Sequence, residues 1–247
     1  MIRPAPVETP PRFTARERRV IARLRTPDDV QRHLNRLPYN VEKGGETLRT
    51  FRGVVRDGTA HCLEAALFAA TVLEAHGYPP LVLSFESRDL LDHVIFVYRG
   101  AGGWGSVARS RDPGLHGRAP VFKTARALAA SYLEPYIDFS GDIRAFAVVD
   151  LRVLGRYDWR LSPRNVWKVE QMLIDWPHRP LRLPAARVGR LRAWYRRFRA
   201  AYPGVKPVDY PGRDRWTALP AECRAGEGLT VEGDPWVSRG RNRASAA

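Results

Sequence analysis

Residues 59–77, TAHCLEAALFAATVLEAHG, decide the fold of this chain. The segment is apolar on nearly all sides, and a helix of that kind is buried at the centre of a domain rather than laid on its surface. Thr59 is a typical residue to cap the start of a helix, and Gly77 is a typical residue to end one. We therefore expect a buried central helix around which the rest of the domain is built.

The segments that follow this helix predict strands. PPLVLSFE (79–86), DHVIFVY (92–98), WGSVARS (104–110) and IRAFAVVDL (143–151) are rich in β-branched and aromatic residues. RGAGG, between the second and third of them, is typical of a hairpin turn. One central helix followed by strands in antiparallel order predicts an α+β fold with the helix packed on an antiparallel sheet.

The chain divides into four predicted regions. Residues 1–25 are expected to form an arm and a short helix, and residues 26–160 the core. Residues 161–202 predict a helical extension packed on that core, with Ser162 as the cap of its first helix. Residues 203–247, rich in Pro, Gly and Arg, predict an irregular, partly disordered basic tail.

Local signals refine the core. Thr26, followed by Pro27 and two aspartates, predicts the start of a helix that ends before Pro38. Residues 39–58 are turn-rich and predict a long loop with little regular structure. Residues 124–137, TARALAASYLEPYI, predict a further helix.

Composition excludes several classes of protein. The chain has 247 residues, of which 44% are hydrophobic, enough for a packed core. No run of 18 apolar residues occurs, so no transmembrane helix is expected, and the N-terminus lacks the apolar segment of a secretory signal. Two cysteines, Cys62 and Cys223, are too few for a disulfide framework. These features predict a cytoplasmic protein.

Charge is concentrated in the second part of the chain. The formal net charge is +15, and residues 151–247 hold 20 basic and 9 acidic side chains. Seven arginines lie between Arg182 and Arg199, on a predicted helix with an apolar stripe of Val188, Leu191, Tyr195, Phe198 and Tyr202. One interpretation is an amphipathic helix docked by its stripe; the other is a surface that contacts nucleic acid or another anionic partner.

Cys62 and His93 are the strongest candidates for catalytic residues. Cys62 lies in the first turn of the central helix, where free amide donors and the helix dipole favour a thiolate. His93 begins a predicted strand after a polar loop, and a histidine near a thiol at a helix N-terminus is the arrangement of a cysteine nucleophile and its base. The alternatives are a small buried apolar residue and a surface histidine.

A third residue is needed to orient the imidazole. If the two strands of the hairpin pair around their turn, His93 lies opposite Ser110. Asp112 shares the side-chain parity of Ser110 and is the only carboxylate among the residues of that parity. We therefore expect Asp112 to orient His93, with Ser110 as the alternative.

Other candidates are weaker. His61 precedes Cys62 but would point about 100° away around a helix, so it is not expected to be the base. Glu64 is expected to match the positive end of the helix dipole. The six histidines include no HExxH and no metal-ligand spacing, so neither a metal nor a cofactor is expected.

The sequence resembles the transglutaminase-like superfamily of papain-like cysteine enzymes, over roughly residues 25–160. More narrowly, it is similar to a little-described bacterial transglutaminase-like group. The similar blocks are LPYNVEKGGETLRT, AHCLEAALFAA, DHVIFVYRG, GWGSVARS, GLHGRAPVF and LAASYLEPY. The resemblance implies a papain-like fold in which Cys62 attacks an amide or thioester carbonyl and His93 is its base.

The third position departs from the family pattern. The superfamily commonly has an acidic residue four positions after a Trp, and counting from Trp104 that position is Ala108. Either the orienting role has moved to Asp112 or Ser110, or it is missing. The resemblance thus implies a cysteine hydrolase or acyltransferase acting on a protein or peptide by amide hydrolysis, deamidation or acyl transfer. The alternative is a non-catalytic binding module that uses its groove or basic helix for a partner.

Overall fold

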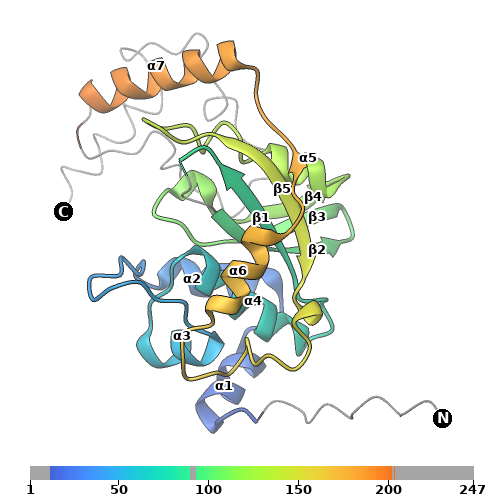
Figure 1. The fold of residues 1–247 in the computed structure, drawn as a ribbon. Coiled ribbons are helices and arrows are strands. Elements are labelled where there is room, and N and C mark those ends of the chain that lie inside the picture. Colours follow the sequence, from blue (N-terminus) through green and yellow to red (C-terminus); the bar gives the residue numbers. More distant parts are fainter. Residues whose placement is uncertain (1–11, 90–92, 202, 204–247) are drawn as a thin grey trace.

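The computed structural model describes residues 12–89, 93–201 and 203. Those residues form an α+β fold, as expected (Figure 1). Its helices are α1 (Ala15–Arg23), α2 (Pro27–Arg36), α3 (Phe51–Asp57), α4 (Cys62–Glu74), α5 (Ala125–Ala130), α6 (Trp167–Asp175) and α7 (Ala185–Ala201). Its strands are β1 (Leu81–Ser87), β2 (His93–Gly100), β3 (Gly103–Val107), β4 (Arg118–Phe122), β5 (Ile143–Asp150) and β6 (Arg179–Pro180). Two short 3₁₀ helices, η1 (Pro113–Leu115) and η2 (Leu151–Leu154), complete the elements.

The six strands form one antiparallel sheet in the order β4-β3-β2-β1-β5-β6. The predicted hairpin is present: β2 pairs with β3, with Phe96 opposite Val107 and Gly100 opposite Gly103. β1 lies between β2 and β5, and Phe85 of β1 is opposite His93. This pairing places the start of β2 beside the end of β1, where His93 is held in the interior of the sheet.

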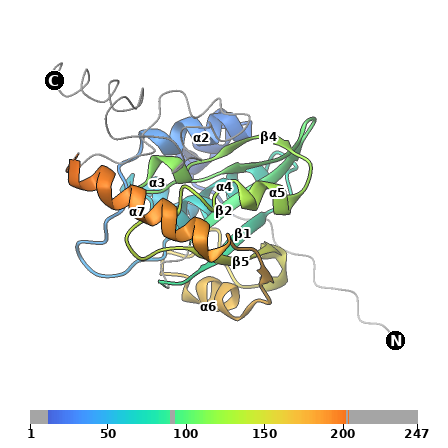
Figure 2. The same cartoon turned by 90° about the horizontal axis from the view of Figure 1, so that it is seen from above.

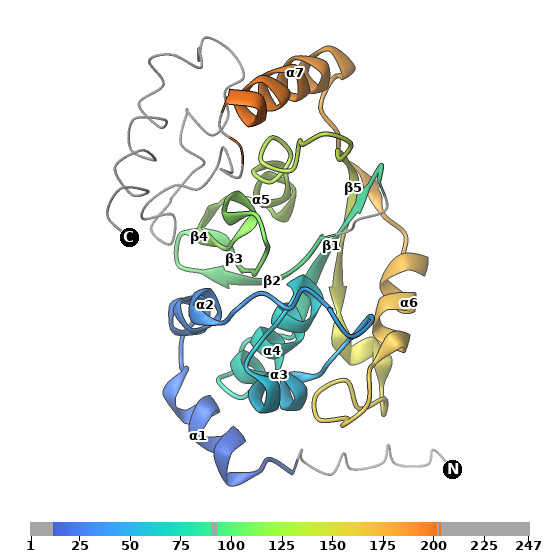
Figure 3. The ribbon, with the colours of Figure 1, turned by 90° about the vertical axis from the view of Figure 1, so that its left-hand side faces the viewer.

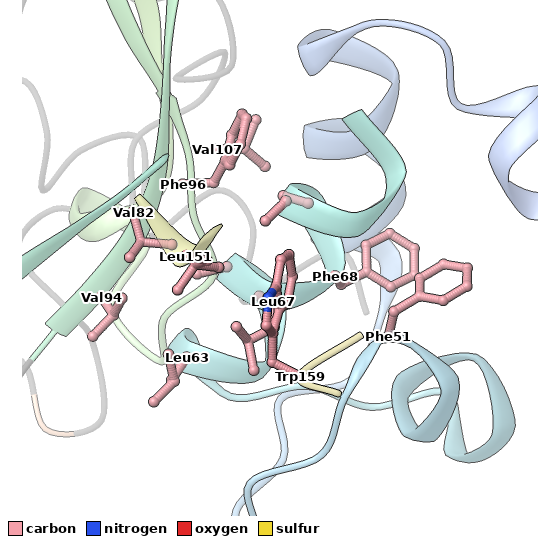
Figure 4. Close-up of a cluster of buried hydrophobic side chains, with 14 of the residues drawn as sticks. Phe51, Leu63, Leu67, Phe68, Val82, Val94, Phe96, Val107, Leu151 and Trp159 are labelled. Atoms are coloured by element: carbon pink, nitrogen blue, oxygen red, sulfur yellow. The ribbon is translucent and has the colours of Figure 1, made fainter. Parts of the chain in front are cut away.

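Helix α4 is the centre of the main core, as its sequence predicts. Every residue from Leu63 to Leu73 is buried, because the helix is covered on all sides. One side packs against the sheet through Val82 and Phe96, and another meets α3, where the rings of Phe51 and Phe68 are 5.2 Å apart (Figure 4). Truncating one large residue of this kind costs about 3–5 kcal/mol, so α4 is fixed firmly in place.

The two faces of the sheet carry different helices. Helices α1 to α4 lie on one side, whereas α5 packs on the other side against Leu83, Phe85, Ile95 and Val97 (Figure 3). Seen from above, α2 and α6 lie at opposite edges of the domain (Figure 2). The first residue of α4 therefore lies near the end of the sheet, with strand ends on one side of it and α6 on another.

Several elements differ from the sequence predictions in where they begin or in whether they were expected. The cap of α4 is His61, not Thr59, because Ala60 forms a parallel bridge with Tyr39 that keeps the preceding chain extended. The predicted loop contains α3, which carries Phe51 and Val54 into the core and ends at Gly58 with a φ of 70°.

The helix expected from Ser162 begins only at Trp167. The reason is a long-range pairing: the Val166 N–H donates to the Leu48 carbonyl at 2.9 Å, and the Leu48 N–H donates to Asn165 Oδ1 at 3.1 Å. The Ser162 hydroxyl instead accepts the Arg164 N–H and forms a local turn. Strands β4 and β6 were not expected, and α5 covers only the first part of residues 124–137.

Helix α7 docks on the core by its apolar stripe. Val188, Leu191, Trp194, Tyr195 and Phe198 are buried, and Val188 and Leu191 cluster with Ile137. Arg187 pairs with Glu134 at 2.7 Å, which fixes the helix further. The other predicted stripe residue, Tyr202, and the predicted tail at 204–247 lie outside the described residues. Among the described residues, no helix has the length and apolar character needed to cross a bilayer.

Candidate active site at the start of helix α4

Cys62 is the first residue of α4, immediately after the extended cap residue His61. The N–H groups at a helix start have no partner within the helix, and the helix dipole is positive there. The Cys62 N–H is hydrogen-bonded to the Tyr39 hydroxyl. The Cys62 side chain is partly exposed and lines a cleft of about 850 Å³. A thiol in this position is both accessible and electrostatically favoured as a thiolate.

The structure brings His93 to the same point. Its side chain is 3% exposed, stacked on Phe85 with an interplanar angle of 4° and packed beside Tyr132. The ring hydrogen-bonds the Cys62 thiol. Its Nε2 lies 3.0 Å from the Leu115 carbonyl oxygen. A carbonyl only accepts hydrogen bonds, so Nε2 carries a hydrogen and Nδ1 is left for the thiol.

The acceptor that holds His93 is thus the Leu115 main chain. The pairing of β2 with β3 ends at Phe96 and Val107, where β3 itself ends, so the predicted pairing of Ser110 with His93 lies beyond the paired residues. Beyond it, the Asp112 N–H donates to Ser110 Oγ at 3.1 Å, and the Leu115 N–H donates to the Asp112 carbonyl at 2.9 Å. Ser110 and Asp112 line the cleft, and an orienting role for either side chain stays a prediction.

Gln31 of α2 fixes the segment that leads to this turn. Its side-chain amide accepts the Ala108 N–H and donates to the Ala108 carbonyl, both at 2.9 Å. Ala108 is the position where the family pattern has its acidic residue, and here its main chain is clamped instead. The sequence analysis missed Gln31, because a glutamine in an amphipathic helix gives no local sign that it bonds a strand end 77 residues away.

His61 is the second imidazole at the thiol, and the prediction that it points away from Cys62 is wrong. That prediction assumed a helical residue, whereas His61 is the cap, with φ −90° and ψ −176°. Its ring hydrogen-bonds Cys62. His61 Nε2 lies 2.9 Å from the Thr47 carbonyl oxygen and 3.6 Å from Glu64 Oε1.

Glu64 holds much of this arrangement together. Its carboxylate is fully buried and receives a two-point contact from Arg49, with Nε and Nη2 each 2.7 Å from an oxygen. Thr47 Oγ1, Asn40 Nδ2 and the His61 N–H also donate to it. Burial alone would raise the pKa of Glu64, but these hydrogen bonds and the nearby positive charges lower it to about 2. Glu64 therefore does more than match the helix dipole.

The same contacts set the ionisation of Cys62 and His61. Burial disfavours the thiolate, but hydrogen bonds from His61 and His93 and their positive charge lower the pKa of Cys62 to about 5. Burial also disfavours the charged form of His61. The hydrogen bond to Cys62, the Cys62 and Glu64 charges and the Thr47 carbonyl outweigh it and raise the pKa of His61 to about 9. The site thus favours a thiolate beside an imidazolium at neutral pH.

The walls of the cleft are acidic, although the whole chain is strongly basic. Seven carboxylate residues line it, against three arginines. The carboxylates are Glu42, Glu46, Glu86, Asp89, Asp112, Asp138 and Glu170, and the arginines are Arg88, Arg111 and Arg144. Arg88 and Arg144 both lie within 4 Å of Asp142, which offsets part of their charge. Burial and the Glu46 charge raise the pKa of Glu170.

No protein-family model and no curated protein matches the chain. The residues themselves therefore carry the functional argument. In the part of the chain that the structure describes, no group of three or more His, Cys, Asp or Glu side chains is arranged to hold a metal ion.

Proposed function

We propose that this protein is a transglutaminase-like cysteine enzyme with a papain-like core that breaks or exchanges an amide-type bond. The single observation that carries the proposal is the position of the Cys62 thiol at a helix start, in a cleft that His93 also lines. Nucleophile, base and an orienting acceptor are the three parts that such chemistry requires. A reducing compartment such as the cytoplasm would keep the thiol available.

The reaction begins when the Cys62 thiolate attacks a carbonyl carbon. A carbon–sulfur bond forms, and the carbonyl electron pair moves to its oxygen. In this proposal, N–H donors at the start of α4 and the hydroxyl of Tyr39, which lines the cleft with Cys62, stabilise that oxyanion. When the tetrahedral intermediate collapses, the leaving nitrogen takes a proton and a thioester remains. His93 serves as the acid–base group of the cycle, and water or an amine then resolves the thioester.

The acidic walls favour a protein or peptide substrate with positively charged residues near the reacting bond. Opposite charge raises the local concentration of such a substrate and its association rate. The cleft is formed by several elements, including the loop before α3, the strand ends and α6, so it suits an extended segment better than a compact small molecule. Hydrolysis, deamidation and acyl transfer share the thioester, and the second nucleophile separates them.

A two-part assay tests the proposal on a Cys223→Ser background, which leaves Cys62 as the only thiol. p-Nitrophenyl acetate should give a burst of nitrophenolate and an acetyl group on Cys62, found by mass spectrometry. Peptide amides rich in arginine and glutamine should then release ammonia or incorporate a fluorescent primary amine. Cys62→Ser should abolish both signals. Acetylation without turnover on any peptide would support the alternative, a non-catalytic binding module.

A further inference from the structure

The two imidazoles at Cys62 are held alike but differ in charge environment. His61 Nε2 is 2.9 Å from the Thr47 carbonyl, and His93 Nε2 is 3.0 Å from the Leu115 carbonyl. His93 is enclosed by the rings of Phe85 and Tyr132, which provide no negative charge. His61 instead faces a buried carboxylate. The nearby carboxylate therefore favours an imidazolium at His61.

Carboxylates from three elements surround His61. Glu64 Oε1 of α4 is 3.6 Å from Nε2, Glu42 Oε1 of the preceding loop is 4.0 Å away, and Glu170 of α6 interacts with it electrostatically. Arg49, the cation that contacts Glu64, is also engaged by Asp57 at 2.9 Å. The negative groups thus dominate the surroundings of the ring.

We propose that His61, positioned by Glu64, holds the proton that Cys62 releases in the resting protein. This inference rests on the proposed function and divides the acid–base work between two catalytic residues. The S–H bond breaks, sulfur keeps the electron pair, and the proton goes to the His61 ring. When the thioester forms and the carbon–nitrogen bond breaks, His61 returns that proton to the leaving nitrogen. His93 then accepts a proton from the water or amine that resolves the thioester, the carbon–sulfur bond breaks with its electron pair going to sulfur, and the proton passes from His93 through the sulfur to His61, which restores the resting pair.

Glu64 is a positioning residue in this scheme, because it acts through His61 and does not touch the sulfur in the contacts described above. It accepts the His61 N–H at 3.1 Å as well as lying close to the ring, so it fixes both the main chain and the charge of that residue. Arg49 keeps Glu64 anionic by the two-point contact. A neutral glutamine would retain the shape of Glu64 but not its effect on the imidazolium.

The test measures the pH profile of the reaction between Cys62 and 4,4′-dithiodipyridine, again on the Cys223→Ser background. His61→Asn should move the midpoint to higher pH and slow the reaction at pH 6 by up to about sevenfold, because the loss of thiolate outweighs the gain in nucleophilicity. Glu64→Gln should move it in the same direction by a smaller amount, and His93→Asn should move it less than His61→Asn. His76→Asn is the matched control, because His76 lies beyond the far end of α4 with its ring on the Ile21 carbonyl. An unmoved midpoint in His61→Asn, or a larger shift in His93→Asn, would overturn the proposal.

A measurement on the folded, unmutated ring covers the case in which a His61 or Glu64 variant does not fold. Histidine ring protons are followed by NMR titration before and after Cys62 is alkylated with iodoacetamide. One imidazole should titrate with a pKa of about 9, because the thiolate stabilises its charged form. The pKa of that imidazole should fall towards 6.5 once the sulfur is blocked. The signal should persist in His93→Asn. If no imidazole titrates above pH 8, or if the signal disappears in His93→Asn, the proposal fails.

Neither readout needs a substrate. A protein that shows the resident thiolate–imidazolium pair but no turnover would keep this inference and refute the proposed enzyme. If the protein turns over peptide but His61→Asn leaves the pH profile unmoved, the proposed enzyme is kept and this inference is refuted.

Discussion

The low pKa of Cys62 predicts a reversal in its reactivity relative to a free thiol as the pH is raised. The hydrogen bonds and charges of the two histidines give Cys62 a pKa of about 5. A free cysteine has a pKa of about 8.5. At pH 6 about 90% of Cys62 is then thiolate, against about 0.3% of a free cysteine, a ratio of about 300.

Lower basicity also makes each thiolate a weaker nucleophile. With a Brønsted coefficient of about 0.45, the difference between the two pKa values costs about 40-fold in intrinsic rate. The net expectation is that Cys62 reacts about sevenfold faster than the free thiol at pH 6 and about 20-fold slower at pH 8.5. The two rates should cross near pH 7.

The assay is stopped-flow exchange with 4,4′-dithiodipyridine, in which the Cys223→Ser protein and a short cysteine peptide are compared from pH 4 to 9. The protein is checked for its fold by circular dichroism at each pH. A protein profile that keeps rising through pH 8, parallel to that of the peptide, would show that the contacts at the start of α4 do not stabilise the thiolate. Steric shielding alone would lower the protein rate at every pH and would produce no crossing.

Three further predictions concern the surroundings of the thiol. Because the Leu115 carbonyl holds His93 Nε2, Asp112→Asn and Ser110→Ala should each change turnover by less than about tenfold; a loss near 10⁴ from Asp112→Asn would give Asp112 the orienting role. Glu64→Gln should lower the free energy of unfolding by about 1–3 kcal/mol in urea titrations, because Arg49 loses the buried one of its two carboxylate partners and keeps only Asp57. Changing both Glu46 and Glu170 to Gln should weaken cleavage of arginine-rich peptides several-fold and remove the salt dependence of KM. An equal effect on anionic peptides would contradict an electrostatic origin of the preference for arginine-rich peptides.

The sequence predicted the elements that carry Cys62 and His93, but only part of what surrounds them. The central helix and the hairpin follow from local patterns, an apolar run with a terminating glycine and two strands around a glycine-rich turn. The boundary at Cys62 could not be predicted, because it depends on the bridge between Tyr39 and Ala60. That error of two residues in the cap also made the geometric argument against His61 fail.

The acceptor for His93 was missed for a different reason. A search for an orienting residue compares side chains, and a main-chain carbonyl carries no signature in the sequence. Strand parity correctly led to the turn that follows β3, but the 3₁₀ helix η1 then presents the Leu115 carbonyl to the ring. Gln31 clamps the main chain of Ala108 where the chain enters this turn, and such a pairing is visible only in the fold.

Packing explains part of the positive charge of the C-terminal half, because several of its arginines have partners within the fold. Arg187 pairs with Glu134, and Arg192 donates to the carbonyls of Ser140 and Gly141 at 3.0 and 2.9 Å. Arg199 donates to the Tyr195 hydroxyl at 3.2 Å. Arg187 and Arg192 therefore help to dock α7, whereas the Arg199 contact lies within the helix, so α7 is not a purely phosphate-contacting surface. Binding of nucleic acid or another anionic partner remains a proposal for the other arginines of the helix.

Under the proposed function, the acidic residue that the resemblance implies at position 108, where this chain has Ala108, is replaced by a carboxylate in the first turn of α4. The task of the carboxylate in a cysteine–histidine site is to stabilise an imidazolium, and the strand that follows His93 is one place from which it can act. Glu64 can perform that task from the helix that carries the nucleophile, provided that its own burial is compensated. Arg49, Thr47 and Asn40 supply that compensation through hydrogen bonds of 2.7 to 3.1 Å. All of these residues fall within two of the blocks on which the family resemblance rests, LPYNVEKGGETLRT and AHCLEAALFAA. In this chain those two blocks therefore form one electrostatic unit. The loop before α3 compensates the burial of Glu64, and Glu64 in turn stabilises the charged form of His61 beside Cys62.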